Sequence, residues 1–248
     1  MTGPLKIATY TCTVEPAEGN AQGELPLTTL VQHILETATF HAESWSVGYS
    51  TLIQENHAWV LARLAVEMER YPRIGDTFVV STWIESYNKY FSARNFEFAD
   101  TAGRIYGYAR SVWSMIDMQT RTSVDLTTFD HLAGRVAGKE CPIAPQSKLK
   151  PVAGEPLFTW PVRCSDIDLN RHVNSVKYIE HMLDSFPLQQ YDDNAVKRFE
   201  INYISETRYG AVFHIFRDET APGVYALDIR TGEGETVCRG KICFEPRK

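Results

Sequence analysis

Asp168-Leu169-Asn170-Arg171-His172-Val173-Asn174 is the most informative stretch of this chain. It carries a carboxylate, two amides and an imidazole at alternate positions, directly before an amphipathic helix. Alternate residues of an extended segment point to the same side. We therefore expect Asp168, Asn170 and His172 to converge beside the helix N-terminus, where backbone N–H groups are free and the dipole is positive. A base, an orienting amide, a proton carrier and an oxyanion-stabilising dipole are the parts that a hydrolase needs.

The helix that follows has a clear beginning and end. Asn174 or Ser175 can cap its start and Pro187 stops it. Its apolar residues recur at spacings of three and four, which predicts one buried face: Val176, Ile179, Met182, Leu183 and Phe186.

Two other interpretations of the motif compete with catalysis. The polar residues could simply cap the helix, as such residues often do. Alternatively, Asp166-x-Asp168-x-Asn170 imitates the start of a calcium-binding EF-hand loop. That loop requires Gly where this chain has Arg171 and a bidentate Glu where it has Lys177. We therefore expect no metal site here, and no motif predicts a cofactor.

The longer stretch from Arg163 to Ile179 resembles the signature of the acyl-acyl carrier protein thioesterases. These are the plant enzymes that terminate fatty-acid chain elongation, together with their bacterial relatives. Their pattern D-x-D-x-N-x-H-V-N-N-x-x-Y-I is matched at nearly every defined position, with Ser175 in place of the second Asn of the pair. The family's second element, a strand that ends in Glu, is similar to Asn202-Tyr203-Ile204-Ser205-Glu206-Thr207. The resemblance extends over the layout of nearly the whole chain.

This resemblance implies an α+β chain with two hotdog folds in tandem, each with a long helix packed on a curved antiparallel sheet. It implies a thioester hydrolase that releases free fatty acid from acyl carrier protein without a cofactor. The implied catalytic residues are Asp168, Asn170, His172 and Glu206. Either Glu206 or Asp168 would be the base or nucleophile, with His172 relaying the proton and Asn170 orienting the carbonyl or water. Thioesters suit this set, because a thiol with a pKa of about 8.5 leaves readily as thiolate.

The chain departs from many plant members at one position. They carry Cys directly after the catalytic Glu, whereas this chain has Thr207, so no thiolate can act there. Cys164 lies near the motif, but cysteines of this kind are usually inert packing. The other histidines show no metal-ligand spacing, and we expect structural positions for them, with His33, His41 and His181 on helices.

Composition narrows the function classes further. The chain has 248 residues, of which 44% are hydrophobic and 23% charged, and no apolar run long enough to span a bilayer. No signal peptide is evident, and five cysteines without C-x-x-C spacing suggest reduced thiols, so we expect a cytoplasmic protein. A net charge of −6 argues against nucleic acid as a partner and means that an acidic carrier protein would need a local basic patch.

The chain also repeats itself weakly. When Gly75 is aligned with Gly210, a shift of 210 − 75 = 135 residues, Val66 falls on Ile201 and Phe78 on Phe213. A helix over 27–45 begins the first copy, with Pro26 suited to its first turn. The alternating patterns predict strands at 59–69, 77–87, 91–99 and 105–116 in the first copy, and at 197–204, 211–217, 224–230 and 237–244 in the second.

These patterns predict three regions: an N-terminal hotdog at 1–135, a Pro-rich linker at 136–156 and a C-terminal hotdog at 157–248. The position that matches Glu206 in the first copy is Tyr71, so only the C-terminal copy is predicted to be catalytic. The N-terminal copy would then bind the acyl chain. Because one chain holds two hotdogs, it could act as an internal pseudo-dimer, and a homodimer also stays open. The remaining alternatives are an acyl-CoA thioesterase, a hotdog dehydratase of hydroxyacyl thioesters, and a protein that binds acyl groups without catalysis.

Overall fold

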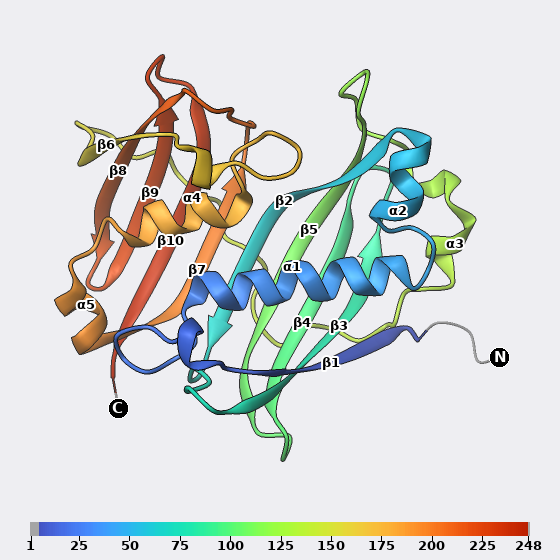
Figure 1. Ribbon diagram of the computed structural model, residues 1–248, viewed down its shortest axis with the longest axis horizontal. Helices are drawn as coiled ribbons and strands as arrows, with labels where there is room; N and C mark the ends of the chain where they lie inside the picture. The colour runs from blue at the N-terminus through green and yellow to red at the C-terminus, as the bar shows by residue number, and fades with distance from the viewer. Residues whose placement is uncertain (1–4, 248) are drawn as a thin grey trace. The chain divides into compact units, whose positions relative to one another are not determined.

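The computed structural model describes residues 5–247, apart from the side chains at positions 130 and 131. The chain divides between residues 145 and 146 into two compact units. Each unit is an α+β hotdog, in which one main helix lies across a curved antiparallel sheet (Figure 1). This architecture confirms the predicted fold class.

Five strands form the sheet within residues 5–145, in the order β1-β3-β4-β5-β2. They are β1 (Ile7–Thr13), β2 (His57–Met68), β3 (Thr77–Tyr87), β4 (Ser92–Asp100) and β5 (Ile105–Asp117). The helices of this unit are α1 (Leu27–Glu43), α2 (Tyr49–Leu52) and α3 (Asp130–Ala133), with 3-10 turns at Pro16–Glu18, Ile53–Glu55 and Leu126–Thr128.

The second unit repeats the arrangement within residues 146–247, with the strand order β6-β8-β9-β10-β7. Its strands are β6 (Phe158–Pro161), β7 (Asn194–Tyr203), β8 (Val212–Ala221), β9 (Val224–Thr231) and β10 (Thr236–Pro246). Its helices are α4 (Ser175–Leu183) and α5 (Leu188–Asp193), with a 3-10 turn at Cys164–Asp166.

The predicted repeat is confirmed strand by strand, because β2 to β5 and β7 to β10 occupy matching places in the two sheets. Phe78 and Phe213 are both fully buried, and Gly75 and Gly210 have nearly equal backbone angles, φ of 88° and 90°. Only glycine adopts such angles without strain. The sequence patterns missed the edge strands β1 and β6; β6 has only four residues, too few for periodicity to reveal.

The two main helices end alike but begin differently. At the C-caps, Ser44 N donates to Phe40 O (3.1 Å) and Asp184 N donates to Glu180 O (2.8 Å). Aligning these caps gives a shift of 184 − 44 = 140, which places Leu27, the first residue of α1, on Ile167 (27 + 140 = 167). Residues 167–174 of the second unit thus correspond to the first eight residues of α1. A polar loop replaces two helical turns there.

The helix of the first unit is held by apolar packing. Leu30, Val31 and Ile34 are fully buried on α1, as are Phe78, Phe96 and Phe98 on the sheet. Complete burial of such a side chain contributes about 1.5–3 kcal/mol each. This packing fixes α1 over the sheet, and the α4 residues Ile179 and Met182, also fully buried, do the same in the second unit.

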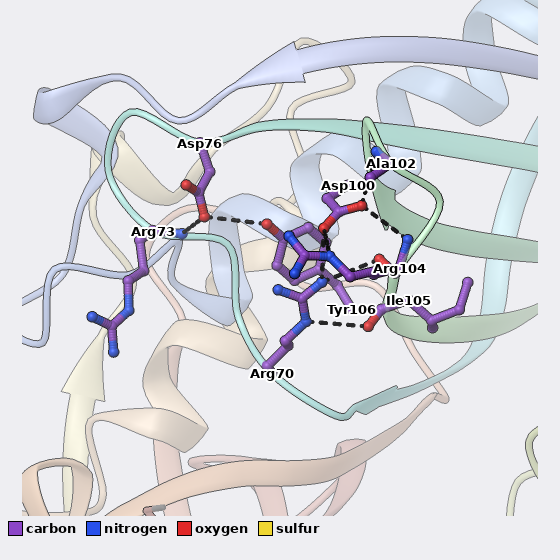
Figure 2. Close-up of polar contacts among 8 residues, drawn as sticks. All are labelled: Arg70, Arg73, Asp76, Asp100, Ala102, Arg104, Ile105 and Tyr106. Carbon is purple, nitrogen blue, oxygen red and sulfur yellow. Dashed lines mark hydrogen bonds and ion pairs between the residues drawn. The ribbon is translucent and has the colours of Figure 1, made fainter.

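A charged network locks the β4–β5 turn (Figure 2). Asp100 Oδ1 accepts the backbone N–H groups of Ala102 (3.0 Å) and Arg104 (2.9 Å), and its Oδ2 pairs with the side chains of Arg104 (2.7 Å) and Arg70 (3.2 Å). The Arg104 backbone bond, aided by the two guanidinium groups, lowers the pKa of Asp100 to about 2. The Arg70 guanidinium lies 4.0 Å from the centre of the Tyr106 ring, which ties the end of β2 to this turn.

Residues 136–156 contain neither helix nor strand, apart from an isolated bridge at Val136. Side chains of each sheet hold this segment. In the first unit Trp83 Nε1 donates to Lys139 O (2.6 Å), and in the second Val152 N donates to the fully buried Asp228 Oδ2 (3.1 Å). The segment is therefore fixed to the units by specific polar contacts.

Among the described residues, no helix is both long and apolar enough to cross a membrane.

Candidate active site

The motif forms a tight loop instead of the predicted extended segment. Ile167 and Val173 pair as an isolated antiparallel bridge, and Asp168 N donates to His172 O (2.8 Å) across the loop. Arg171 closes it with a left-handed φ of 62°, which costs a residue other than glycine some strain. The alternation argument for Asp168, Asn170 and His172 is therefore wrong, since it holds only for a strand.

Asp168 instead holds the loop in shape. Its Oδ1 accepts the backbone N–H groups of Asn170 (2.8 Å) and His172 (3.2 Å). Aspartate readily forms such turns, because its short side chain reaches the backbone two residues on. The carboxylate thereby fixes the backbone that carries His172.

Asn174 begins the helix. Its Oδ1 accepts the N–H of Val176 (2.9 Å), and its own backbone N–H donates to Asp166 O (2.8 Å). Asn174 is thus the N-cap that the sequence predicted as one of two candidates. It joins the end of the loop to the residue preceding Ile167.

Glu206 meets His172 from a different part of the chain. His172 Nε2 lies 3.5 Å from Glu206 Oε2, and the two side chains are 14% and 37% exposed. Val173 N donates to Thr207 O (2.8 Å), which aligns the motif loop with the segment after β7. An imidazole and a carboxylate that are partly exposed at this separation can exchange protons with a water molecule or substrate between or beside them.

Asn170 stands apart from this pair. It is exposed, and in the described part of the chain its side-chain amide makes no hydrogen bond. Of the four predicted residues, the structure thus brings His172 and Glu206 together, joins Asp168 to the His172 backbone, and leaves the Asn170 amide toward solvent.

Two tyrosines that the sequence motif does not single out support the first turn of α4. Tyr203 Oη donates to Ser175 O in the first turn of α4 (2.9 Å), and the rings of Tyr178 and Tyr203 lie edge to face with centroids 6.0 Å apart. Burial raises the pKa of both phenols, so they stay neutral. Both are visible in the sequence, Tyr178 within the family pattern, but only the fold shows that they lie together.

The described residues of the first unit contain no counterpart of this set. Helical residues of α1 occupy the place of the loop, and Tyr71 occupies the place of Glu206. Across residues 5–247, leaving aside the side chains at 130 and 131, no three or more His, Cys, Asp or Glu side chains form a group that could hold a metal ion. All five cysteines are free thiols, and Cys164 is exposed.

Two family models match most of the chain. Residues 8–128 match the family model of the acyl-ACP thioesterase N-terminal domain, and residues 152–246 match that of the C-terminal domain. A palmitoyl-acyl carrier protein thioesterase from Gossypium hirsutum is 26% identical over 88% of this chain and 59% of that protein. An oleoyl-acyl carrier protein thioesterase from Arabidopsis thaliana is 26% identical over 84% of this chain and 62% of its own length. The chain thus spans about three-fifths of the length of these curated plant relatives.

Solved structures extend the likeness to the whole chain. A crystal structure of an acyl-ACP thioesterase from Bacteroides thetaiotaomicron is 38% identical, with a TM-score of 0.93, covering 99% of this chain and all of that one. The 12:0-ACP thioesterase from Umbellularia californica is 22% identical, with a TM-score of 0.84, and covers 98% of each chain. The second likeness is one of fold.

Proposed function

The chain belongs to the acyl-ACP thioesterase family, and from this premise we propose that it hydrolyses the thioester of a fatty acyl group carried on acyl carrier protein. The observation that carries the proposal is the pairing of His172 Nε2 with Glu206 Oε2 at 3.5 Å. The products would be a free fatty acid and the carrier protein with its free thiol, which ends elongation of that chain.

In this proposal Glu206 is the general base and His172 relays the proton. Glu206 has the more exposed of the two side chains and can reach a water molecule, which it deprotonates as the water attacks the thioester carbonyl. The proton then passes through His172 to the departing sulfur. The Asn170 amide, which faces solvent, would donate to the carbonyl oxygen as it becomes an oxyanion.

Asp168 has a different role in this mechanism. Because its Oδ1 already accepts two backbone N–H groups, it is poorly placed to attack the substrate. It would keep the His172 ring aimed at Glu206. Between the two carboxylates that the sequence left open as base, this geometry favours Glu206.

We further propose that the N-terminal unit houses the acyl chain, since it has the fold but lacks the catalytic set. One chain would then suffice for activity, with its two hotdogs acting as an internal pair. The five free cysteines are consistent with a reducing compartment such as the cytoplasm.

The test is thiol release from acyl-acyl carrier protein and from acyl-CoA, measured side by side with the same acyl group. We expect a kcat/KM at least tenfold higher for the carrier-protein substrate. Equal or greater turnover of acyl-CoA would make the chain an acyl-CoA thioesterase, and no thiol from either would refute thioester hydrolysis.

His172→Ala tests the site itself. It should lower kcat by about 10² or more, the scale of losing a general acid–base group. His214→Ala is the matched control, because His214 lies in β8 outside the set and should leave kcat unchanged.

A further inference from the structure

A buried carboxylate lies at the base of the active-site loop. Asp166 is 3% exposed and ends the 3-10 turn that precedes the loop. Its Oδ2 accepts the Arg163 N–H (2.7 Å), and its carbonyl accepts the Asn174 N–H (2.8 Å). Asp166 therefore joins the residues on either side of the loop that carries Asp168 and His172.

A buried histidine faces this carboxylate. His181 lies on α4, is 2% exposed, and has Nε2 3.9 Å from Asp166 Oδ1. Its ring packs 5.0 Å from the Trp160 ring of β6 and 6.1 Å from the Phe213 ring of β8. The imidazole is thus enclosed by aromatic rings on the side of the sheet and by the turn that leads into the loop.

Neither ring nitrogen of His181 has a hydrogen-bond partner among the described residues. Burial lowers the pKa of His181, while the charge of Asp166 opposes that shift, so the ring is neutral near pH 7 and carries one N–H. Leaving such a donor unpaired in a buried site is costly. Closing the 3.9 Å gap by about 1 Å would give an ordinary hydrogen bond.

We propose that Asp166 and His181 are positioning residues of the active site, with His181 Nε2 donating to Asp166 Oδ1 while the loop is in its working position. The proposal rests on the thioesterase function proposed above. Neither side chain reaches solvent, so neither touches substrate. The pair acts by fixing the base of the loop against the last turn of α4, and so fixes the distance between His172 and Glu206.

Two variants of His181 separate this role from simple core packing. His181→Gln keeps an N–H group near the position of Nε2, whereas His181→Leu fills similar volume without a donor. For acyl-acyl carrier protein hydrolysis, we expect His181→Leu to lower kcat about tenfold or more while KM changes less than twofold, since small misplacements of catalytic groups reduce rate strongly. His181→Gln should recover most of that loss although its Tm is no higher.

Substitution of Asp166 provides the second part of the test. Asp166→Asn should lower kcat, and combining it with His181→Leu should add little, because both changes remove one interaction. The matched control is Tyr191→Phe, which removes a different hydrogen bond of the last turn of α4, the one that Tyr191 Oη donates to Leu183 O (2.7 Å). It should lower Tm and leave kcat unchanged.

Clear outcomes would overturn the proposal. These are wild-type kcat in His181→Leu, equal losses in the Gln and Leu variants, or a loss in Tyr191→Phe as large as in His181→Leu. NMR of the imidazole protons gives a readout that needs no turnover: the His181 Nε2–H signal should be slow to exchange and shift in Asp166→Asn. If the wild-type protein failed to hydrolyse acyl-acyl carrier protein, the proposed function would fall, whereas the imidazole signal would still test the pair.

Discussion

Asp168 and Glu206 are both carboxylates of the site, but their oxygens have different surroundings. Asp168 Oδ1 accepts two backbone N–H groups of its own loop, whereas Glu206 reaches His172 from the segment after β7. An amide oxygen can replace a carboxylate as hydrogen-bond acceptor but cannot serve as a general base. Replacing Asp168 by Asn and Glu206 by Gln, which are near-isosteric changes, should therefore reduce kcat to different extents.

We expect Glu206→Gln to lower kcat by about 10² or more and Asp168→Asn to lower it less, because the Asn oxygen can still hold the loop. Asp168→Ala, which removes that acceptor, should lose more activity than Asp168→Asn. Steady-state kinetics with acyl-acyl carrier protein measures all three. If Asp168→Asn lost more activity than Glu206→Gln, the roles assigned here would be reversed.

His41 provides a prediction on pH. It is 1% exposed, its Nδ1 lies 2.9 Å from Arg94 Nη1, and its Nε2 lies 2.9 Å from Leu5 O. Since a guanidinium can only donate, Nδ1 must accept and the ring is the neutral Nε2–H tautomer. Burial, together with the charge of Arg94, lowers the pKa of His41 to about 4.

The unfolded chain binds a proton at this residue near pH 6.5, whereas the folded chain does so only near pH 4. The contribution of His41 to stability is therefore complete above pH 6.5 and is lost as the pH falls from 6.5 to 4, with a slope of at most about 1.4 kcal/mol per pH unit. Urea unfolding at several pH values gives the free energy of unfolding as a function of pH. This free energy should depend less steeply on pH for His41→Gln than for the wild type. Identical slopes would mean that His41 is not buried in its neutral form.

The loop that replaces the first two turns of the helix distinguishes the second unit from the first. Helix α4 has nine residues and α1 has 17, and the loop that takes the place of the missing turns holds three residues of the proposed catalytic set. Such a short helix depends on its cap, because helices of this length gain little from propensity alone. Asn174 caps α4 and also joins the loop to Asp166.

Asn174→Ala should lower the free energy of unfolding by about 1 kcal/mol, the usual effect of losing an N-cap. Asn174→Ser retains a capping oxygen and is the matched control, with most of that stability kept. Urea titration gives the free energy of unfolding. A change in kcat shows whether the substitution also disturbs the loop that carries His172. If Asn174→Ala were as stable as Asn174→Ser, the cap would contribute nothing.

The sequence patterns anticipated the larger elements well and the loop poorly. Periodicity located α1, α4 and the eight longer strands, because each buries a regular apolar face over many residues. It could not locate β6, which has four residues, nor show that the motif folds back on itself. That reversal depends on Arg171 adopting a φ of 62° and on the Asp168 backbone contacts, and arginine gives no local signal for such a conformation. The approach of Glu206 to His172 joins residues 34 positions apart (206 − 172), which only the tertiary fold determines.

Two hotdogs of one strand order share a chain, and among the described residues only the second holds the proposed catalytic set. A unit without catalytic groups can serve as a binding surface. In α1, Leu30 and Ile34 are fully buried in the core of the first unit, whereas Val60 and Ala62 of β2 are only partly buried. The partly buried positions are therefore better candidates for contact with an acyl chain than the helix residues.

We expect changes of size at Val60 and Ala62, such as Val60→Ala and Ala62→Leu, to alter the ratio of kcat/KM between acyl substrates that differ by two carbons. Each buried CH₂ is worth about 0.8 kcal/mol, so a two-carbon step can shift this ratio roughly ten- to fifteenfold.

Leu30→Ala and Ile34→Ala should mainly lower stability, by about 2–5 kcal/mol, because they leave cavities in a packed core. Met182→Ala, at the fully buried position in α4, is the matched control in the second unit and should lower stability or rate while leaving the ratio unchanged. Kinetics with a series of acyl chain lengths measures the ratio for every variant, and a preference that moved only with Met182→Ala would assign chain-length selection to the catalytic unit instead.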